Sequence, residues 1–286
     1  LSFTPSSAGN RKTWTWSSWV KLNNDGYGNL FANLVNNQNG LYVYWSSGIF
    51  TISDYNTTGG ASLHTTRLFR DYSSWYHIVI VMDSPQATAS DRVKLYINGV
   101  QETLAGSQPN QHVEGKWNAV QTHYIGQQSN NVSDYNLDGY LADVHFVDGQ
   151  ALTASDFGEY DDNNVWQPKK YSGTYGTNGF HLDFSDNSSD SALGTDSSGN
   201  SNDWTVNNLT ASGNDYENAV FTENSTTYNS SASGKNFYTG TGANLFDNNT
   251  STLVGGYNLG ASWLYFRPAT AITGVTSLEI YGSYNE

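Results

Sequence analysis

The stretch RVKLYINGVQETL, residues 92–104, carries the clearest local pattern in the sequence: two runs of alternating apolar residues flank Asn98-Gly99. A type I′ turn needs positive φ at both central residues, and Asn-Gly adopts that conformation most readily. Because side chains alternate between the two faces of a strand, Val93, Leu95 and Ile97 share one face. The stretch therefore predicts a β-hairpin with one buried face.

The register of this hairpin follows from its two-residue turn. Val100 is expected opposite Ile97, and Leu104 opposite Val93. Glu102 interrupts the apolar row. By itself the hairpin predicts architecture and not activity.

Further strand patterns follow one another at short spacing over the first 184 residues. They are TWTWSSWVKL (13–22), LYVYW (41–45), IFTIS (49–53), SWYHIVIVM (74–82), THYIG (122–126), GYLADVHFV (139–147) and NGFHLDF (178–184). Trp14 and Trp16 share a face of the first and are expected in the core. No segment has convincing helical periodicity, although Thr153 is placed to cap a turn within 151–160. Many short strands with regular turns predict an all-β sandwich or barrel.

The composition of the polar residues has two interpretations. The chain has 286 residues with 20 Tyr and 9 Trp, while charged residues make up only 13%. Its polar residues are mostly Asn, Ser and Thr, unlike the Lys- and Glu-rich surface of a typical cytosolic enzyme. Amides, hydroxyls and aromatic rings can hydrogen-bond to sugars and stack on them. The same residues also fill the turns of an all-β protein, and this second interpretation carries the larger weight.

Net charge and missing residue types exclude several classes of function. Lys and Arg number 12 against 26 Asp and Glu, and the net charge of −14 repels nucleic-acid backbones and anionic membranes. No apolar run is long enough to span a bilayer, so no membrane insertion is expected. The lack of Cys excludes thiolate catalysis, disulfides and Cys-based zinc sites. The chain begins at Leu1, so we expect a processed product or part of a longer polypeptide.

The composition changes after residue 184. Residues 185–236 are rich in Ser, Asn and Gly and predict a linker or extended arm, with one further strand at 204–209. Residues 237–286 resume strand-and-turn patterns but are too few for an independent domain without disulfide or metal. We therefore expect a β-sandwich at 1–184, a linker, and the start of a second, truncated β module.

Candidate catalytic residues are few, and the sequence predicts no catalytic site. Glycoside hydrolases need two carboxylates that face each other, and the nearest acidic strand offers only Asp143 and Asp148, on opposite faces of a straight strand. The six histidines form no HExxH motif, and His77 fits a satisfied sheet position better than a general base. Nucleophile-elbow and P-loop motifs are absent. These observations favour a non-enzymatic protein.

Aromatic rings near turns are the candidates for stacking on a sugar. They are Trp117, Trp45, Tyr55, Tyr27 and Tyr72. Trp117 lies in HVEGKWNAV (112–120), where polar residues flank it, and is the ring least expected in the core. The alternative that these rings are packing residues stays open.

The segment DYNLDG, residues 134–139, has the Asp-x-Asn-x-Asp-Gly spacing that opens a calcium loop. His145 replaces the Glu expected at the twelfth position, so an EF-hand is excluded. Asp134, Asn136 and Asp138 remain candidate calcium ligands. An Asp/Asn-rich turn that caps a hairpin is the other explanation, and the shortness of the motif favours it.

Four motifs in order resemble the laminin G-like / concanavalin A-like lectin superfamily. They are SSWYHIVIVMDS (73–84), RVKLYINGV (92–100), THYIG (122–126) and GYLADVHFVDGQAL (139–152). The resemblance covers about residues 1–184 and implies a jelly roll of two antiparallel sheets. In pentraxin relatives the loop after the Ile-Gly strand supplies acidic calcium ligands, and Gln128 and Asn130 stand in that loop here. The resemblance thus adds both to the candidate calcium ligands, although no cofactor is required.

Longer segments resemble large virion proteins of marine bacteriophages, described as tail-fibre-like or structural. These segments are residues 6–22, 141–158, 168–188 and 196–209. Segments 245–253 and 264–282 resemble the start of a discoidin-like carbohydrate-binding jelly roll. The resemblance implies an extracellular virion-surface protein that binds host-surface glycans, with other virion proteins as partners and a homotrimer as the expected oligomer. A purely structural module without sugar binding and a secreted bacterial adhesin are the alternatives.

Overall fold

The computed structural model describes residues 1–33, 39–128 and 135–211, together with four short strands farther along the chain. These strands are β16 (Phe221–Glu223), β17 (Thr226–Tyr228), β18 (Phe237–Thr239) and β19 (Gly255–Gly256). The chain divides into two compact units. The first comprises Leu1–Asp186 and Ser191–Leu209, and the second comprises Asn187–Asp190 and Thr210–Glu286.

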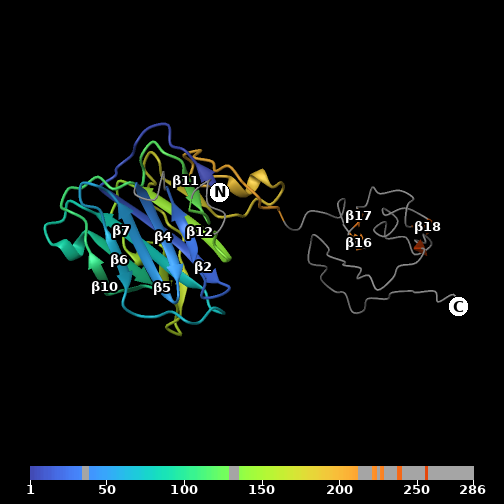
Figure 1. Ribbon diagram of the computed structural model, residues 1–286, viewed down its shortest axis with the longest axis horizontal. Coiled ribbons are helices and arrows are strands. Elements are labelled where there is room, and N and C mark those ends of the chain that lie inside the picture. Colours follow the sequence, from blue (N-terminus) through green and yellow to red (C-terminus); the bar gives the residue numbers. More distant parts are fainter. Residues whose placement is uncertain are drawn as a thin grey trace. The chain divides into compact units, whose positions relative to one another are not determined.

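The first unit is a sandwich of two antiparallel sheets (Figure 1). One sheet has seven strands in the order β1 (Ser2–Phe3), β11 (His123–Ile125), β3 (Gly28–Ala32), β4 (Gly40–Ser46), β5 (Ile49–Tyr55), β6 (Ser62–Thr65) and β10 (Leu104–Ser107). The other has six, in the order β15 (Phe180–Leu182), β12 (Gly139–Asp148), β2 (Thr13–Leu22), β7 (Tyr76–Asp83), β8 (Val93–Ile97) and β9 (Val100–Gln101). The described residues contain no α-helix. The all-β, two-sheet jelly-roll sandwich that the sequence predicts is confirmed.

Aromatic side chains fill the space between the two sheets. The ring of Trp16, on β2, stacks on that of Phe31, on β3, with 4.0 Å between centroids. Trp117 and Phe180 meet the same indole edge-on. Trp14 is equally buried, so the prediction that this tryptophan pair lies in the core is confirmed.

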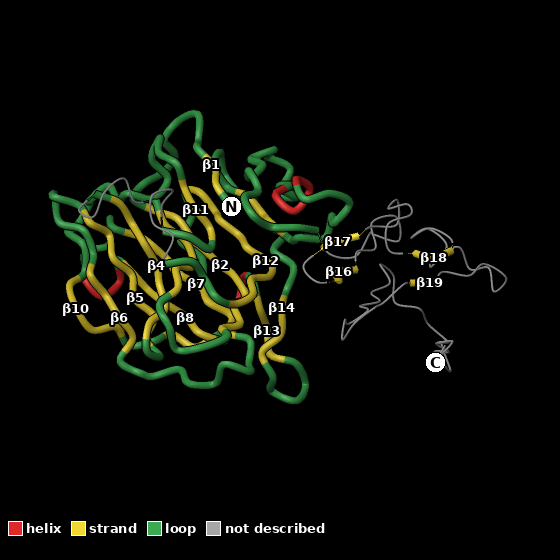
Figure 2. The backbone as a smooth tube through the Cα atoms, turned by 45° about the vertical axis from the view of Figure 1, so that its right-hand side comes forward, coloured by secondary structure: helices red, strands yellow, loops and turns green. Residues whose placement is uncertain are grey.

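A smaller apolar cluster covers part of the outer face of the six-stranded sheet. It contains Val79, Val81, Val147, Ala154, Phe157 and Tyr171. The segment after β12 supplies the last three, through a single 3-10 turn (Ala154–Asp156) and the hairpin of β13 (Gly158–Tyr160) and β14 (Trp166–Pro168), seen side by side in Figure 2. The carboxylate of Asp156 accepts a hydrogen bond from the backbone N–H of Thr153, as expected for a cap at this position. β7 and β12 therefore have apolar contacts on both faces.

The hairpin at 92–104 has the predicted turn. Asn98 and Gly99 have φ of 48° and 82°, as a type I′ turn requires. Val100 pairs with Ile97, which confirms the predicted register at the turn. Val100 is nevertheless 55% exposed, because β9 is the edge strand of the sheet.

The predicted pairing of Leu104 with Val93 is wrong. The chain leaves the six-stranded sheet after β9, and Leu104 pairs instead with Thr65 of β6 in the opposite sheet. Glu102 stands at this crossing and forms an ion pair with Arg67. The residue that breaks the apolar row in the sequence is thus where the chain changes sheets.

The segment after residue 184 differs from the predicted linker. Residues 191–209 belong to the first compact unit. Trp204 is 3% exposed, with its ring 4.9 Å from Phe180 and 5.5 Å from Phe3. Thr205 pairs with Ser2 through one isolated bridge, where the sequence predicts a strand. This indole and the backbone hydrogen bonds between Ser2 and Thr205 therefore hold a mostly polar segment on the sandwich, which its low average hydrophobicity does not predict.

The second unit contains two pairs of short antiparallel strands, β16 with β17 and β18 with β19. The expectation that residues 237–286 begin a second β module stays a prediction. In the part of the chain that the structure describes, no helix is long and apolar enough to cross a membrane.

Candidate functional site

Strand β4 presents two different faces. Leu41, Val43 and Trp45 are buried in the core between the sheets. Tyr42 and Tyr44 alternate with them and are half-buried on the opposite face. The outer face of the seven-stranded sheet therefore carries aromatic rings where a strand of this kind more often carries polar side chains.

These two rings belong to a continuous row of five tyrosines, which we call the tyrosine row: Tyr135, Tyr27, Tyr44, Tyr42 and Tyr55. Successive ring centroids are 4.8, 4.5, 5.2 and 5.5 Å apart in that order. All but the first pair are stacked, with interplanar angles of 19–28°. The two end residues are 41% and 43% exposed, so solvent reaches the row at both ends.

The phenol groups of Tyr27 and Tyr42 remain protonated over the physiological pH range. Burial raises the pKa of Tyr27, and the neighbouring tyrosines raise it further. Burial also raises the pKa of Tyr42, with a smaller contribution from its hydrogen bond to the hydroxyl of Tyr55, at 3.1 Å. These hydroxyls can therefore donate as well as accept hydrogen bonds.

Asn29 of β3 fixes one end of the row. Its backbone N–H and its side-chain amide both donate to the carbonyl oxygen of Tyr135, at 3.3 and 2.7 Å. The asparagine side chain is fully buried. Tyr135 is therefore held by a paired contact, although it lies on a loop.

Polar side chains of β5 and β6 lie beside Tyr44 and Tyr42 in the seven-stranded sheet. Tyr44 is paired with Thr51, which is paired with His64. Tyr42 is paired in the same way with Ser53, and Ser53 with Ser62. Aromatic rings thus lie beside hydroxyl and imidazole groups, a combination that can contact both the C–H face and the hydroxyls of a sugar.

The sequence identifies part of this row. Tyr27 and Tyr55 are among the predicted stacking residues, and the structure brings them together through Tyr42 and Tyr44. Tyr72 lies elsewhere: it packs against the core, with its ring edge-on to that of Trp45 at 6.2 Å. The alternation in LYVYW (41–45) is the signal that could have revealed the two central rings.

Two predicted sugar-stacking residues are core residues. Trp117 is 1% exposed, so the expectation that it is the ring least suited to the core is wrong. Its indole packs edge-on against Phe31 and His123, at 4.8 and 4.2 Å. Trp45 is also 1% exposed and packs on Phe50. Polar neighbours along the chain are a poor guide to Trp117, because the loop turns this one side chain inward.

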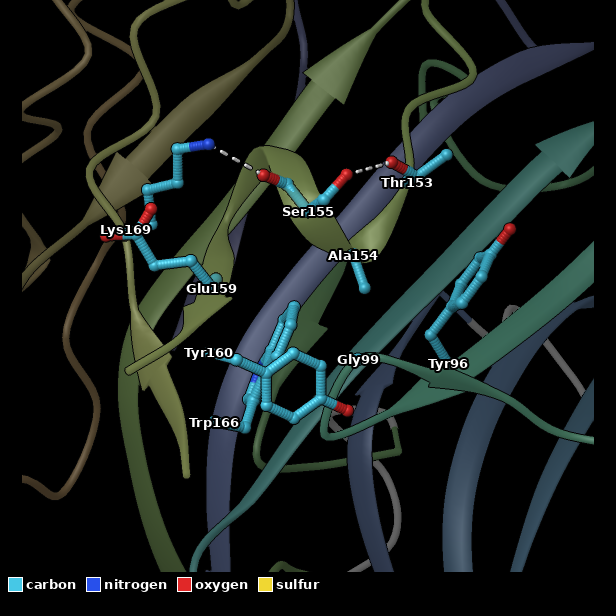
Figure 3. A pocket seen from close by; sticks show the side chains of 10 residues that line it. Tyr96, Gly99, Thr153, Ala154, Ser155, Glu159, Tyr160, Trp166 and Lys169 are labelled. Carbon is cyan, nitrogen blue, oxygen red and sulfur yellow. Dashed lines mark hydrogen bonds between the residues drawn. The ribbon is translucent and has the colours of Figure 1, made fainter. Parts of the chain in front are cut away.

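A second group of aromatic rings lines a cavity of about 370 Å³ beside the hairpin turn (Figure 3). Tyr160 is 48% exposed and meets Trp166 edge-on at 4.8 Å. The indole N–H of Trp166 donates to Nδ1 of His77, whose Nε2 contacts the Ser17 hydroxyl at 2.9 Å. Burial lowers the pKa of His77 to about 4, so it is a neutral, satisfied sheet residue, as predicted.

The predicted calcium ligands are described in part. Asn130 and Asp134 lie outside the described residues, whereas Gln128, Asn136 and Asp138 lie within them. The carboxylate of Asp138 accepts hydrogen bonds from the side-chain amides of Asn23 and Asn24, at 2.7 and 2.5 Å. These two bonds tie Asp138 to the neighbouring turn, as the alternative of a capped turn expects.

The acidic residues of β12 join separate networks. Asp148 accepts hydrogen bonds from the side-chain amide of Asn118 and the backbone N–H of Asn178, whereas Asp143 contacts His145 and His181. This arrangement agrees with their predicted separation on the strand. Asp143, His145 and His181 are the one group of three His, Cys, Asp or Glu side chains in the described chain that lie close enough to hold a metal.

Comparison with solved structures finds likenesses in fold. A SAP-like pentraxin from Limulus polyphemus is 18% identical, with 53% of this chain and 70% of that chain covered and a TM-score of 0.39. Domains LG4-5 of the mouse laminin α1 chain are 13% identical, with 53% and 43% covered and a TM-score of 0.38. The chain therefore spans less than half of that laminin fragment. A comparison with curated protein sequences finds no match.

The family is shown by sequence. Residues 2–158 match the family described as the concanavalin A-like lectin/glucanases superfamily, laminin G type. The matched segment runs from the first strand of the sandwich to the start of β13, and includes the hairpin at 92–104. Since the match spans more than half of the 286 residues and the fold is a sandwich of two antiparallel sheets, the chain belongs to the concanavalin A-like lectin/glucanase superfamily.

Proposed function

We propose that the chain is a non-enzymatic carbohydrate-recognition module and that a glycan lies along the tyrosine row. The observation that carries the proposal is the row itself: five neighbouring rings on the outer face of a sheet. A sugar ring offers an apolar C–H face and a rim of hydroxyls. A tyrosine side chain can contact both, because its ring stacks on the C–H face and its hydroxyl forms hydrogen bonds with the sugar hydroxyls.

The geometry of the row favours an extended ligand. Its inner rings stack on one another, so the exposed ring surface lies at the two ends, Tyr135 and Tyr55, and a ligand that contacts both ends must extend along the row. Single stacking contacts are weak, and several on one chain strengthen binding through effective concentration. We therefore expect an oligosaccharide to bind more tightly than its monosaccharide.

The non-enzymatic part of the proposal rests on the side chains beside the row. Hydrolysis of a glycosidic bond needs two carboxyl groups across the sugar. The positions paired with Tyr44 and Tyr42 along the sheet are Thr51, Ser53, Ser62 and His64. None is a carboxylate, so this face is suited to binding and not to hydrolysis.

The cellular setting is a further part of the proposal. We place the module on the surface of a bacteriophage virion, as a fibre, tail or capsid-decoration protein that recognises host glycans. The resemblance of residues 6–22, 141–158, 168–188 and 196–209 to virion proteins supports this setting. Other virion proteins and a homotrimer are the partners it implies, and a net charge of −14 argues against nucleic acid. A secreted bacterial adhesin is the alternative setting.

A structural module without sugar binding is the second candidate function. The same exposed rings would suit a protein partner, since tyrosine is enriched at protein interfaces. A glycan array probed with the full chain separates the two. The proposal expects a set of related oligosaccharides to bind, whereas an array without reproducible binding would favour the structural module.

A further inference from the structure

Two histidines lie side by side on neighbouring strands of the six-stranded sheet. His145 of β12 is directly paired with His181 of β15. Their imidazole rings are stacked, with centroids 4.0 Å apart and planes 10° apart. The pair is therefore fixed by the register of the sheet.

A β-bulge brings a carboxylate to the same pair. The pairing of β12 with β2 shifts between Ala142 and His145, and Asp143 within the bulge has a φ of 52°. This conformation is uncommon for a residue other than glycine. It places Oδ1 of Asp143 2.6 Å from Nε2 of His181 and 3.2 Å from Nε2 of His145. The strained backbone at Asp143 thus brings one carboxylate oxygen close to two imidazole nitrogens.

Hydrogen bonds hold both nitrogens of His181. The hydroxyl of Ser197 lies 3.0 Å from the carbonyl oxygen of His181 and 2.9 Å from its Nδ1, so it can donate to either. The separation of 2.6 Å between Nε2 and Oδ1 of Asp143 is a hydrogen-bond distance, with the hydrogen on Nε2. A metal ion bound by both groups replaces this hydrogen.

His145 is held in a similar way. Its Nδ1 contacts the hydroxyl of Tyr175 at 2.8 Å. Its side chain is 3% exposed, and its Nε2 has no well-aligned hydrogen-bond partner among the described residues, although Oδ1 of Asp143 lies 3.2 Å away. A buried polar nitrogen without a partner is unfavourable unless something binds it. Both histidines therefore present Nε2 to one point, with Nδ1 held by a hydroxyl.

The surrounding loop fixes the group. The buried carboxylate of Asp196 accepts hydrogen bonds from the backbone N–H groups of His181, Ser198 and Asn202, each at 2.9 Å. Ser197 lies within this loop and is held with it. The cluster also borders a cavity of about 500 Å³, so solvent or a ligand can reach it.

We propose that Asp143, His145 and His181 bind a divalent transition-metal ion. Two imidazole nitrogens and one carboxylate oxygen are ligands that Zn²⁺ accepts, with the remaining position open to water from the cavity. Tyr175 and Ser197 act as positioning residues, because hydrogen bonds to the distal nitrogens of metal-binding histidines fix their tautomer and orientation. In a tetrahedral site the ligand atoms lie about 3.3 Å apart, so the Asp143 carboxylate moves slightly outward on binding.

A Ser–His–Asp catalytic relay is the competing interpretation of Ser197, His181 and Asp143. In such a relay the serine hydroxyl donates to the histidine. Here the hydroxyl also contacts a carbonyl oxygen, and a second imidazole shares the same carboxylate oxygen. The metal site accounts for both histidines, whereas the relay leaves His145 without a role.

The test is calorimetric titration of the full chain, without a histidine tag and freed of metal by a chelator that is then removed, with ZnCl₂. One Zn²⁺ per chain is expected. Asp143→Asn and His181→Gln should abolish this binding, and Tyr175→Phe should weaken it about tenfold. His112→Asn is the matched control, since His112 is exposed on another loop with a φ of 63°, which asparagine tolerates.

Melting curves in chelator confirm that each variant is folded before it is titrated. Asp143→Asn keeps the size of the side chain, so it provides the test if His181→Gln unfolds. Absence of binding in the unmodified chain would overturn the proposal. So would equal Zn²⁺ affinity in the unmodified chain and Asp143→Asn, or covalent labelling of Ser197 by a fluorophosphonate.

Discussion

The indole ring of Trp166 lies directly against Gly99, so closely that a β-carbon on this glycine would be 2.5 Å from the ring. The hairpin turn that the sequence identifies is thus also a packing position. Gly99 serves two purposes at once, since its φ of 82° is one that other residues rarely adopt.

Substitution of Gly99 should therefore lower the free energy of unfolding by more than backbone strain alone would. Gly99→Val combines a β-branched residue at positive φ with a clash against Trp166, and should lower the free energy of unfolding by about 3 kcal/mol. Gly126→Ala is the control, because Gly126 has a φ of 77° but a β-carbon there would meet no atom within 4 Å. Urea unfolding of Gly99→Ala and Gly126→Ala compares the two effects. Equal losses would show that the indole contact adds nothing.

Asp54 should make the free energy of unfolding depend on pH. Burial raises the pKa of this carboxyl from 3.8 to about 7, and a hydrogen bond from the backbone N–H of Lys116 only partly opposes the rise. Between these two values the folded state holds a proton that the unfolded state has released, so stability falls as pH rises from about 4 to 7. Above pH 7 the full cost of burying the charge is present.

Asp54→Asn should remove this dependence, because the amide resembles the protonated acid. At about 1.4 kcal/mol per pKa unit, the variant should gain up to ~4 kcal/mol over the unmodified chain at pH 8, and little at pH 4. Urea unfolding at a series of pH values measures the difference between the two chains. A constant difference across this range would contradict the assignment.

Trp204 makes residues 191–209 part of the sandwich. A chain truncated after residue 184 loses this indole, which packs against Phe180 and Phe3. Removal of a buried tryptophan costs about 3–5 kcal/mol. The chain ending at residue 184 should therefore unfold at clearly lower urea concentration than a chain ending at residue 211, and identical midpoints would show that the segment does not stabilise the sandwich.

Calcium is expected to leave the turn at Asp138 unchanged. Its carboxylate already accepts hydrogen bonds from Asn23 and Asn24. Asp138→Asn should lower stability by about 1 kcal/mol through the loss of one such bond, to the same extent with and without CaCl₂. A rise in melting temperature with CaCl₂ that Asp138→Asn abolishes would instead support the predicted calcium site.

Regular alternation makes most of the fold predictable from the sequence. The strands at 13–22, 41–45 and 139–147 all appear near their expected bounds, because one buried face imposes a period of two. The exceptions are residues whose positions depend on packing between segments far apart in the sequence. Leu104 changes sheets, and Trp117 turns inward from a polar stretch.

The candidate sites are less predictable for the same physical reason. Tyr42 and Tyr44 follow from alternation along one strand, but Tyr135 joins them only through tertiary structure. Asp143 meets His145 and His181 because of a bulge and a strand pairing that link residues 38 positions apart. No local pattern in the sequence specifies either arrangement.

The central claim is that a glycan binds along the tyrosine row. The most direct test is calorimetric titration with the best-bound oligosaccharide from the array, using the unmodified chain, Tyr42→Ala, Tyr55→Ala and the control Tyr160→Ala. Tyr160 is as exposed as Tyr55 but lines the cavity at the hairpin. Both substitutions in the row should weaken binding about tenfold or more, since Tyr55→Ala removes an exposed ring and Tyr42→Ala removes the ring on which Tyr55 stacks, and the control should bind as the unmodified chain does. Unchanged affinity in Tyr42→Ala and Tyr55→Ala, or loss of binding in Tyr160→Ala alone, would contradict the account.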